Sequence, residues 1–359
     1  MREVFRNKKV LITGHTGFKG TWLTMLLSKM GARVMGYALA PNTAPAMYNV
    51  VNADEYCLSV IGDLRDRKLL EKTMVDFGPD FIFHLAAQPI VRTSYNIPVE
   101  TFEVNTLGTV NVLEAMRKME KQCVAVMITT DKVYRNNESG RAYTEGDPLG
   151  GYDPYSASKA AAEIVIDSYR NSFFNPTNYE HHHKSVASVR AGNVIGGGDW
   201  ATDRLVPDIA RALSAGKAIE IRNPKAVRPW QHVLEPLMGY ITVAAKISHN
   251  PTLFNEGFNF GPNPADVVTV GDMAQMGVDI WGEGTLEFPK QVNQPHEANL
   301  LSLDIAKAQK LLGWKPMMNA REALDITLRW YKAYYAGEDM RLLTEKQIDD
   351  YLNQYEADR

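Results

Sequence analysis

A threonine, an aspartate, a tyrosine and two lysines fall in two short segments whose side chains could together move protons and hydride. Thr130, Asp131 and Lys132 follow an apolar run, and Tyr155 and Lys159 stand four residues apart further along the chain. On a helix that spacing places both side chains on one face, one turn apart. A phenol beside an ammonium can take a proton from a hydroxyl while hydride leaves the same carbon. The additional carboxylate and ammonium indicate more than a simple oxidation.

The structural alternatives for these segments are ordinary ones. A tyrosine at the edge of an amphipathic helix and a surface Asp-Lys pair in a turn would show the same residues at the same spacing. Thr130 ends a predicted strand, where open α/β sheets bind their ligands. That position favours a catalytic role.

A glycine-rich turn near the N-terminus is the expected binding place for a dinucleotide. The sequence GHTGFKG follows the apolar run VLIT and opens a helical pattern. Glycine lets the backbone approach a pyrophosphate, and a helix N-terminus supplies oriented N–H groups. The predicted cofactor-binding residues of this turn are Gly14, His15, Thr16, Gly17, Phe18 and Gly20.

The second strand lacks a residue that this kind of site usually has. Its end, Gly36 to Ala40, carries no acidic residue to hold the adenosine ribose and no arginine to receive a 2′-phosphate. This pattern favours NAD over NADP. Asp63 and Leu64 are expected either to contact the adenine amino group or to form part of a helix cap.

The elements that must position these residues alternate along the first half of the chain. Short apolar runs and longer helical patterns are typical of a parallel sheet with crossover helices. Strands are expected at 10–13, 33–39, 81–85, 124–129 and 186–191. Helices are expected at 18–29, 66–77, 98–119 and 154–172, the last with Asp153 as its cap and proline at its first position.

We therefore predict an α/β fold, a Rossmann-type doubly wound parallel sheet with a smaller, loop-rich C-terminal substrate lobe. The NAD-binding domain is expected at 1–191, with returning segments at about 231–256 and 320–340. The substrate lobe is expected mainly at 192–319, followed by a helical tail at 340–359.

Composition excludes several classes of protein. The chain has 359 residues and a formal charge of −3, which gives no support to nucleic acid or an anionic membrane surface as a partner. Its only cysteines, Cys57 and Cys123, are expected as buried free thiols in a reducing compartment. No apolar run is long enough for a secretory signal or a bilayer span, so we expect a cytoplasmic protein. His181 to His183 is expected to be solvent-exposed, and no metal site is predicted, because adjacent histidines do not converge on one ion.

Over nearly its whole length the sequence resembles the extended short-chain dehydrogenase/reductase family. Besides the glycine turn, the matching residues are His84, Ala86, Ala87, Gln88, Asn105, Thr130, Tyr155, Lys159, Arg190, Asn193 and Arg228. The resemblance implies that Ala86, Ala87, Gln88 and Asn105 contact NAD, and that Lys159 holds the nicotinamide ribose and tunes the tyrosine. It also implies a homodimer joined by a four-helix bundle of 98–119 and 154–172, or a tetramer.

Within that family the sequence is similar to the nucleotide-sugar 4,6-dehydratases. The dTDP and GDP branches carry glutamate where this chain has Lys132, and the stretch RAGNVIGGGDW resembles the branch that acts on CDP-glucose. The resemblance implies oxidation at C4, loss of water across C5 and C6, and return of hydride to C6, with NAD regenerated. The product would be CDP-4-dehydro-6-deoxyglucose, an intermediate of deoxysugar biosynthesis of the O-antigen type.

The resemblance also implies individual roles for the catalytic residues. Tyr155 would take the proton of the 4-hydroxyl, and Thr130 would hydrogen-bond the same oxygen. Asp131 would protonate the departing 6-hydroxyl, and Lys132 would be the base at C5. These two roles conflict, because a close lysine lowers the pKa of an aspartate that must donate a proton. The sequence leaves open which residue moves which proton.

A diphosphate substrate calls for guanidinium groups and helix N-termini. The predicted substrate-binding residues are Ser94, Asn193, Arg204 and Arg228, with Arg92 beside Ser94 as a further candidate. His296 is either a phosphate or ribose contact or part of a structural turn.

Two other functions stay open. A nucleotide-sugar 4-epimerase shares the tyrosine, lysine, threonine and NAD, but normally lacks an acid–base pair after the threonine. A non-catalytic dinucleotide-binding sensor would usually have lost the Tyr-x-x-x-Lys pair, which this chain keeps.

Overall fold

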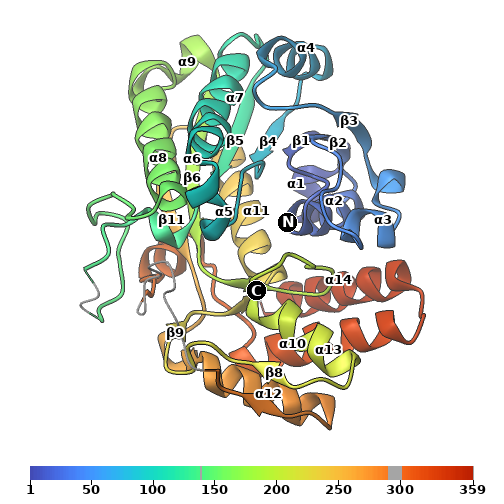
Figure 1. Ribbon diagram of the computed structural model, residues 1–359. Helices are drawn as coiled ribbons and strands as arrows, with labels where there is room; N and C mark the ends of the chain where they lie inside the picture. Colours follow the sequence, from blue (N-terminus) through green and yellow to red (C-terminus); the bar gives the residue numbers. More distant parts are fainter. Residues whose placement is uncertain (138–139, 290–300, 359) are drawn as a thin grey trace.

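The computed structural model describes residues 1–137, 140–289 and 301–358, and its centre is a parallel β-sheet (Figure 1). Within these residues the sheet has seven strands in the order β11-β6-β5-β4-β1-β2-β3. They are β1 (Lys9–Thr13), β2 (Arg33–Ala38), β3 (Leu58–Ile61), β4 (Phe81–His84), β5 (Cys123–Ile128), β6 (Lys184–Ala191) and β11 (Gly257–Phe260). All neighbouring pairs run parallel, so the predicted α/β fold with a doubly wound sheet is confirmed.

Both faces of the sheet are covered by helices, because successive residues of its strands are apolar on either side. Val10 and Ile12 of β1 join one hydrophobic cluster, and Leu11 between them joins the other. The first cluster includes α2 (Phe18–Lys29) and α11 (Leu234–His249). The second includes α4 (Arg67–Phe77), α7 (Gly108–Arg117) and α8 (Pro154–Ser172).

Local signals set most of these boundaries as expected. Helices α2 and α8 have the predicted bounds, and the side chain of Asp153 caps α8 by accepting from the N–H of Ser156. Asp66 caps α4, and Gly78 ends it in a left-handed conformation (φ 59°). The strand β3 was not predicted, and the seventh strand β11 begins just beyond the returning segment expected at about 231–256.

The predicted helix at 98–119 is interrupted. It consists of α6 (Pro98–Phe102), a π-helical turn η2 (Glu103–Leu107) and α7. The turn contains Asn105, which is fully buried. Such π-helical turns often occur at functional sites, and this one carries Asn105 next to the loop that follows β4.

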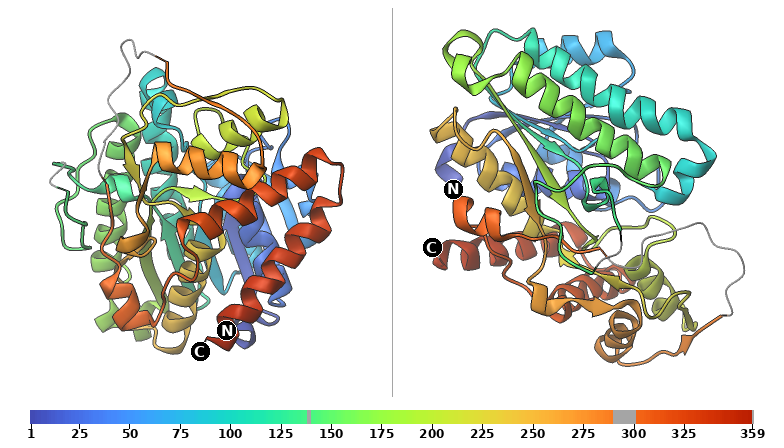
Figure 2. Two further views of the ribbon diagram at one scale, coloured as in Figure 1. Left: turned by 90° about the horizontal axis from the view of Figure 1, so that it is seen from below. Right: turned by 90° about the vertical axis from the view of Figure 1, so that its left-hand side faces the viewer.

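A smaller lobe lies below the sheet and is built largely from loops and short elements (Figures 1 and 2). Its helices are α10 (Leu205–Ser214) and α12 (Val270–Trp281). Its strand pairs are β7 (Val194–Ile195) with β10 (Gln231–His232), β8 (Ile219–Glu220) with β13 (Leu286–Glu287), and β9 (Val227–Arg228) with β12 (Val268–Thr269).

The remaining short elements of the described chain are α1 (Arg2–Phe5), α3 (Met47–Val50), η1 (Ala53–Tyr56), α5 (Val91–Asn96), η3 (Asp131–Val133), η4 (Pro176–Asn178), α9 (Tyr179–His182), η5 (Pro264–Asp266) and η6 (Ala308–Leu312).

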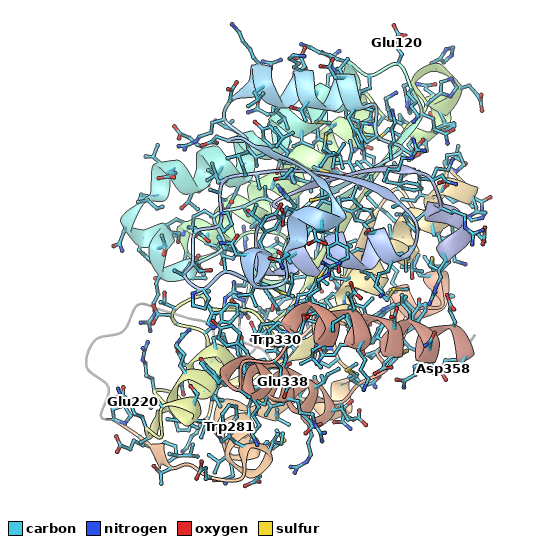
Figure 3. All side chains as sticks on the ribbon, turned by 90° about the vertical axis from the view of Figure 1, so that its right-hand side faces the viewer. Glu120, Glu220, Trp281, Trp330, Glu338 and Asp358 are labelled. Carbon is cyan, nitrogen blue, oxygen red and sulfur yellow. The ribbon has the colours of Figure 1, made fainter. Side chains whose placement is uncertain are left out.

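The C-terminal helices α13 (Ala320–Tyr335) and α14 (Met340–Ala357) pack against the body of the molecule (Figure 3). Trp330 is buried and its ring lies 5.5 Å from that of Trp200. On α14, Tyr351 donates to Glu235 of α11 at 3.1 Å. The predicted tail is therefore a helix with a buried face that belongs to the core.

The exposure of one cysteine and one histidine differs from what the sequence predicts. Cys123 is buried, but Cys57 is partly exposed, so the prediction of two buried thiols is wrong for Cys57. His182 is half-buried because its ring nitrogens pair with the backbone of Asn175 and Lys184, whereas its two histidine neighbours are exposed. No helix in the described part of the chain has the length and apolar character needed to cross a bilayer. The same described residues bring together no set of three or more His, Cys, Asp or Glu side chains suited to a metal ion.

Candidate active site

A cavity of about 1220 Å³ opens between the carboxyl ends of the sheet strands and the C-terminal lobe. This is the edge at which open α/β sheets bind ligands. Predicted residues that line it are Gly14, Thr16, Gly17, Phe18, Gly20, Asp63, Leu64, Ala86, Ala87, Arg92, Thr130, Asp131, Lys132, Tyr155, Lys159, Asn193, Arg204 and Arg228. Residues from distant parts of the sequence thus meet in one site.

The glycine turn between β1 and α2 is tightly folded. Gly14 has φ 80°, and a Cβ on it would lie 2.7 Å from the backbone nitrogen of Ala86. A Cβ on Gly20 would lie 2.0 Å from the carbonyl oxygen of Gly14. No side chain caps the N-terminus of α2 at Gly17. This uncapped helix end beside the cavity suits the diphosphate of a dinucleotide.

His15 does not present its side chain to the cavity, although it belongs to this turn. Its ring packs against Gly36 of β2, where a Cβ would lie 2.1 Å from the ring. Its Nε2 pairs with the hydroxyl of Ser59 at 2.8 Å, and burial lowers its pKa to about 4. The ring therefore stays neutral and fills the space beside the strand end that lacks an acidic residue.

Asp63 is held in the turn that follows β3. Its carboxylate accepts from the backbone and the guanidinium of Arg65, the latter at 2.7 Å. These hydrogen bonds from Arg65 lower the pKa of Asp63. Because Asp66 is the residue that caps α4, the helix-cap interpretation of Asp63 is wrong.

Lys19 is a cavity residue that the sequence analysis missed. Its ammonium donates to the hydroxyl of Tyr240 on α11 at 3.3 Å. Burial lowers its pKa to about 7, and the positive charges of Arg204 and Lys159 act in the same direction. The sequence feature that could have indicated Lys19 is its position as a charged residue inside the glycine turn.

Three predicted contact residues lie behind the cavity wall and hold other residues in place. Asn105 accepts from the backbone N–H of Gln88 at 2.8 Å and donates to the hydroxyl of Ser158 at 2.9 Å. Ser94 accepts from the backbone N–H of Tyr155 at 3.1 Å. The structure thus places Gln88, Asn105 and Ser94 as supports for the loop after β4 and the start of α8.

Thr130, Asp131 and Lys132 lie together where β5 ends. The Thr130 hydroxyl donates to Asp131 Oδ1 at 2.9 Å, and Lys132 Nζ donates to the same oxygen at 3.2 Å. Asp131 is buried, whereas the Lys132 side chain is 30% exposed. A Cβ on Gly192 would lie 3.2 Å from Asp131 Oδ2, so glycine there makes room for the carboxylate.

Tyr155 and Lys159 project from the first two turns of α8 into the same cavity. Lys159 Nζ donates to the carbonyl of Ile128 at 3.3 Å, and burial lowers its pKa to about 8. Burial raises the pKa of Tyr155, against the opposing effects of the Lys132 charge and a hydrogen bond with Thr130. The expected lowering of the tyrosine pKa by Lys159 is therefore absent in the protein itself, where Lys132 is the main charge acting on the phenol.

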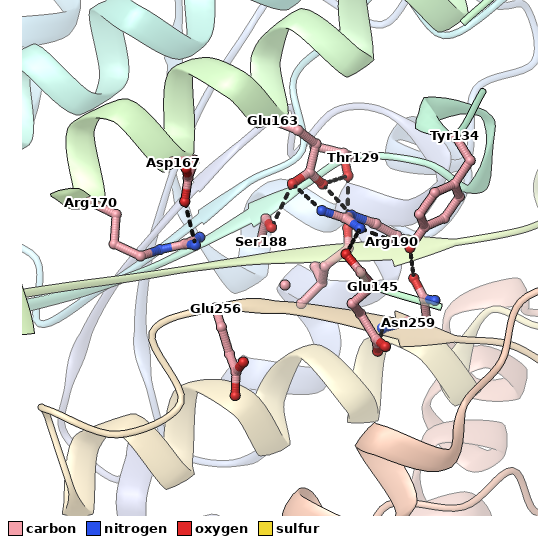
Figure 4. Close-up of polar contacts among 12 residues, drawn as sticks. Thr129, Tyr134, Glu145, Glu163, Asp167, Arg170, Ser188, Arg190, Glu256 and Asn259 are labelled. Atoms are coloured by element: carbon pink, nitrogen blue, oxygen red, sulfur yellow. Dashed lines mark hydrogen bonds and ion pairs between the residues drawn. The ribbon is translucent and has the colours of Figure 1, made fainter. Parts of the chain in front are cut away.

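A second missed residue, Glu163, lies four residues and about one helical turn beyond Lys159 on α8. Figure 4 shows its side chain directed toward Arg190. Its carboxylate accepts from Arg190 Nε and Nη2, both at 2.9 Å. Burial raises its pKa, but the hydrogen bonds and charge of Arg190 outweigh burial and hold the pKa below its usual value. The sequence feature that could have indicated Glu163 is its spacing of four residues from Lys159 on a predicted helix.

The predicted substrate-binding arginines lie in the lobe. Arg204 pairs with Asp199 at 2.6 Å, and Arg228 donates to its neighbouring carbonyl at 3.1 Å. Asp203 bridges Arg92 and Arg222 at 3.3 and 3.0 Å beside the cavity. Guanidinium groups thus gather around the opening. His296 lies outside the described residues.

Comparison with known proteins agrees with this geometry. Residues 11–327 match the family model described as GDP-mannose 4,6 dehydratase. A CDP-glucose 4,6-dehydratase from Salmonella typhimurium is 47% identical over 352 residues, covering 98% of each chain. The solved structure of a dTDP-glucose 4,6-dehydratase from Streptomyces venezuelae, with NAD and TYD bound, has a TM-score of 0.77 and 25% identity, covering 92% of this chain and 98% of that chain. The chain belongs to the GDP-mannose 4,6 dehydratase family.

Proposed function

We propose that this protein is an NAD-dependent nucleotide-sugar 4,6-dehydratase that converts CDP-glucose to CDP-4-dehydro-6-deoxyglucose and water. The observation that carries the proposal is the contact between Asp131 and Lys132 at 3.2 Å, in the cavity that Tyr155 and Lys159 line. A 4-epimerase needs the phenol and its lysine, but water loss needs a further acid and base. We call Asp131 and Lys132 the elimination pair, and Tyr155 and Lys159 the oxidation pair.

The glycine turn and the residues opposite it are suited to hold the dinucleotide. Gly14 and Gly20 keep the turn clear of Cβ atoms, and Asp63, Ala86 and Ala87 line the adjoining wall. NAD bound there would supply the acceptor for hydride from C4 of the sugar and its donor to C6. Lys159 would donate to the nicotinamide ribose from the neighbouring helix.

The oxidation pair and Thr130 act at the 4-hydroxyl. Tyr155 accepts the hydroxyl proton as phenolate, and the positive charge of Lys132 favours that form. Thr130 would hydrogen-bond the same sugar oxygen. The 4-ketone that results makes the proton on C5 acidic, which prepares the loss of water.

The elimination pair then acts at C5 and C6. After C4 oxidation, their shared hydrogen bond lets a proton pass from Lys132 to Asp131, which leaves the lysine neutral and the aspartate protonated. Lys132 then takes the C5 proton, and Asp131 gives a proton to the departing 6-hydroxyl, so one molecule of water leaves. When hydride returns to C6, Lys132 gives its proton back to C5, and the proton that Tyr155 took from the 4-hydroxyl restores the pair.

The substrate identity follows from the arginines and from the relative. Arg204, Arg228 and Asn193 line the lobe side of the cavity, where they can bind a diphosphate. The preference for cytidine rests on the 47% identity to a CDP-glucose 4,6-dehydratase. We also propose that the protein acts in the cytoplasm, as its sequence leads us to expect.

The experiment is incubation with CDP-, dTDP-, GDP- and UDP-glucose, followed by mass spectrometry for the loss of one water. CDP-glucose deuterated at C4 should give a product with deuterium in its methyl group. A Lys132→Ala variant should still oxidise C4 but should not release water. Epimerised sugar without water loss would support the epimerase instead, and deuterium lost to solvent would refute the internal hydride return.

We also propose that two copies associate through α6, η2, α7 and α8. Large apolar side chains are exposed on these helices, and they are Val99, Phe102, Leu107 and Ile164. An exposed apolar face of this kind indicates a protein contact. Ile164→Glu should convert the dimer to a monomer in light-scattering chromatography, whereas Glu338→Gln, in the connection between α13 and α14, should not. A parent protein that is monomeric would contradict the proposal.

A further inference from the structure

We propose that Glu163, Arg190 and Tyr134 form a positioning network that couples the elimination pair to the oxidation pair. The inference rests on the proposed function, because it concerns the order and separation of its two chemical steps. None of the three residues belongs to either pair, and all three are buried. Figure 4 shows them between α8, β6 and the loop that follows β5.

The network begins on the helix that carries the oxidation pair. Glu163 accepts two hydrogen bonds from Arg190 and one from the hydroxyl of Ser188 at 2.8 Å. It also accepts from the hydroxyl of Thr129, the residue that directly precedes Thr130. A bidentate contact of this kind fixes both partners in orientation as well as distance. Helix α8 is thus fastened to the ends of β5 and β6.

The network continues from Arg190 to the elimination pair. Arg190 Nη1 donates to the hydroxyl of Tyr134 at 2.8 Å, and its guanidinium lies 5.1 Å from the centre of the tyrosine ring. The Tyr134 hydroxyl donates to Asn259 of β11 at 2.7 Å. The ring also stacks on that of Tyr143, with the ring centres 5.3 Å apart. Hydrogen bonds and ring contacts therefore both hold Tyr134.

Tyr134 directly follows the short turn η3, in which the elimination pair lies. The backbone of this segment is tied down as well, since Gly150 donates to the carbonyl of Val133 at 2.8 Å. Lys132 is the partly exposed member of the turn, so its direction depends on how the chain on either side is anchored. Thr130 anchors one side and Tyr134 the other. Movement of Tyr134 would displace the lysine from C5 while leaving the phenol in place.

Glu163 also has an electrostatic effect on the oxidation pair. Burial lowers the pKa of Lys159 to about 8, and the negative charge of Glu163 opposes that change. Removing the carboxylate would lower the lysine pKa further. The ammonium would then be lost at a lower pH, together with its support for the cofactor.

The first experiment compares Tyr134→Phe with the matched control Ser188→Ala. Each removes one buried hydroxyl that hydrogen-bonds a residue of the network, but only the Tyr134 hydroxyl lies next to the elimination pair. With bound NAD and CDP-glucose, C4 oxidation is followed by single-turnover absorbance of the reduced nicotinamide, and elimination by water loss in quenched samples. We expect Tyr134→Phe to slow elimination about tenfold or more and C4 oxidation less than about twofold. Ser188→Ala should leave both steps within about twofold.

The second experiment measures the pH dependence of C4 oxidation in Glu163→Gln. We expect its alkaline limb to move to lower pH by about one unit, because an opposite charge near Lys159 is removed. If this variant fails to fold because Arg190 is left without its partner, Tyr134→Phe alone decides the proposal. Equal slowing of both steps in Tyr134→Phe, or slowing of neither, would overturn the inference. A parent protein that removes no water from any nucleotide sugar would refute the proposed function instead.

Discussion

Glu235→Gln is expected to change how the stability of the protein depends on pH. Glu235 lies on α11 and is fully buried. Its carboxylate accepts from the backbone N–H groups of Met317 and Met318 at 3.0 and 2.9 Å, and from Tyr351. Burial raises its pKa from 4.5 to about 7. The folded protein therefore binds a proton at Glu235 over a pH range in which the unfolded chain has released it.

The sign and size of the effect follow from that difference. Stability from Glu235 is fully present below its unfolded pKa of 4.5, and is lost as pH rises through about 7. A separation of about 2.5 pH units corresponds to about 3 kcal/mol of unfolding free energy. Glutamine has no charge to bury, and its amide oxygen can still accept both backbone N–H groups. Because part of this change lies below pH 5, the variant should lose about 2.5 kcal/mol less than the parent between pH 5 and pH 8.

The assay is urea unfolding of the cofactor-free protein, followed by tryptophan fluorescence at pH 5 and pH 8. The difference between parent and variant isolates Glu235 from the other groups that titrate in this range. Glu338→Gln, at an exposed position, serves as the control and should follow the parent. Parallel pH profiles for parent and Glu235→Gln would refute the reasoning.

Three further predictions concern the cavity. Gly20→Ala places a Cβ 2.0 Å from a backbone oxygen and should weaken NAD binding, measured by calorimetry, about 5- to 150-fold, because overpacking of this kind costs about 1–3 kcal/mol. Tyr155→Phe should abolish the 4-ketone while CDP binding stays within about threefold, since the phenol acts on the reacting hydroxyl; retained ketone formation would remove the tyrosine from its assigned role. Asp203→Asn keeps a residue that tolerates the φ of 60° but removes the charge that bridges two arginines. It should tighten CDP binding about two- to fivefold at low salt and less at high salt, and weaker binding at low salt would show that the carboxylate instead organises the arginines.

Part of this site could be predicted from short stretches of sequence. Gly14, Gly20, Tyr155 and Lys159 were identified by type and spacing, and the structure places all of them around one cavity. Helix α8 begins at the expected residue because Asp153 and the proline after it are a local signal. Such features depend on neighbours within a turn or two of the chain, which the sequence shows directly.

Other roles depended on burial and on partners far away in the sequence. The side chain of His15 turns from the cavity because Gly36, on another strand, leaves room for its ring. Glu163 looks like an ordinary helical glutamate until β6 brings Arg190 against it. The neutral form of such a histidine and the charged form of such a glutamate depend on which groups exclude water and which supply hydrogen bonds. The sequence by itself determined the glycine turn, the reacting side chains and all strands of the sheet except β3 and β11, because these follow local patterns. Tertiary packing decided which polar groups hold them in place, since only the folded chain brings those partners together.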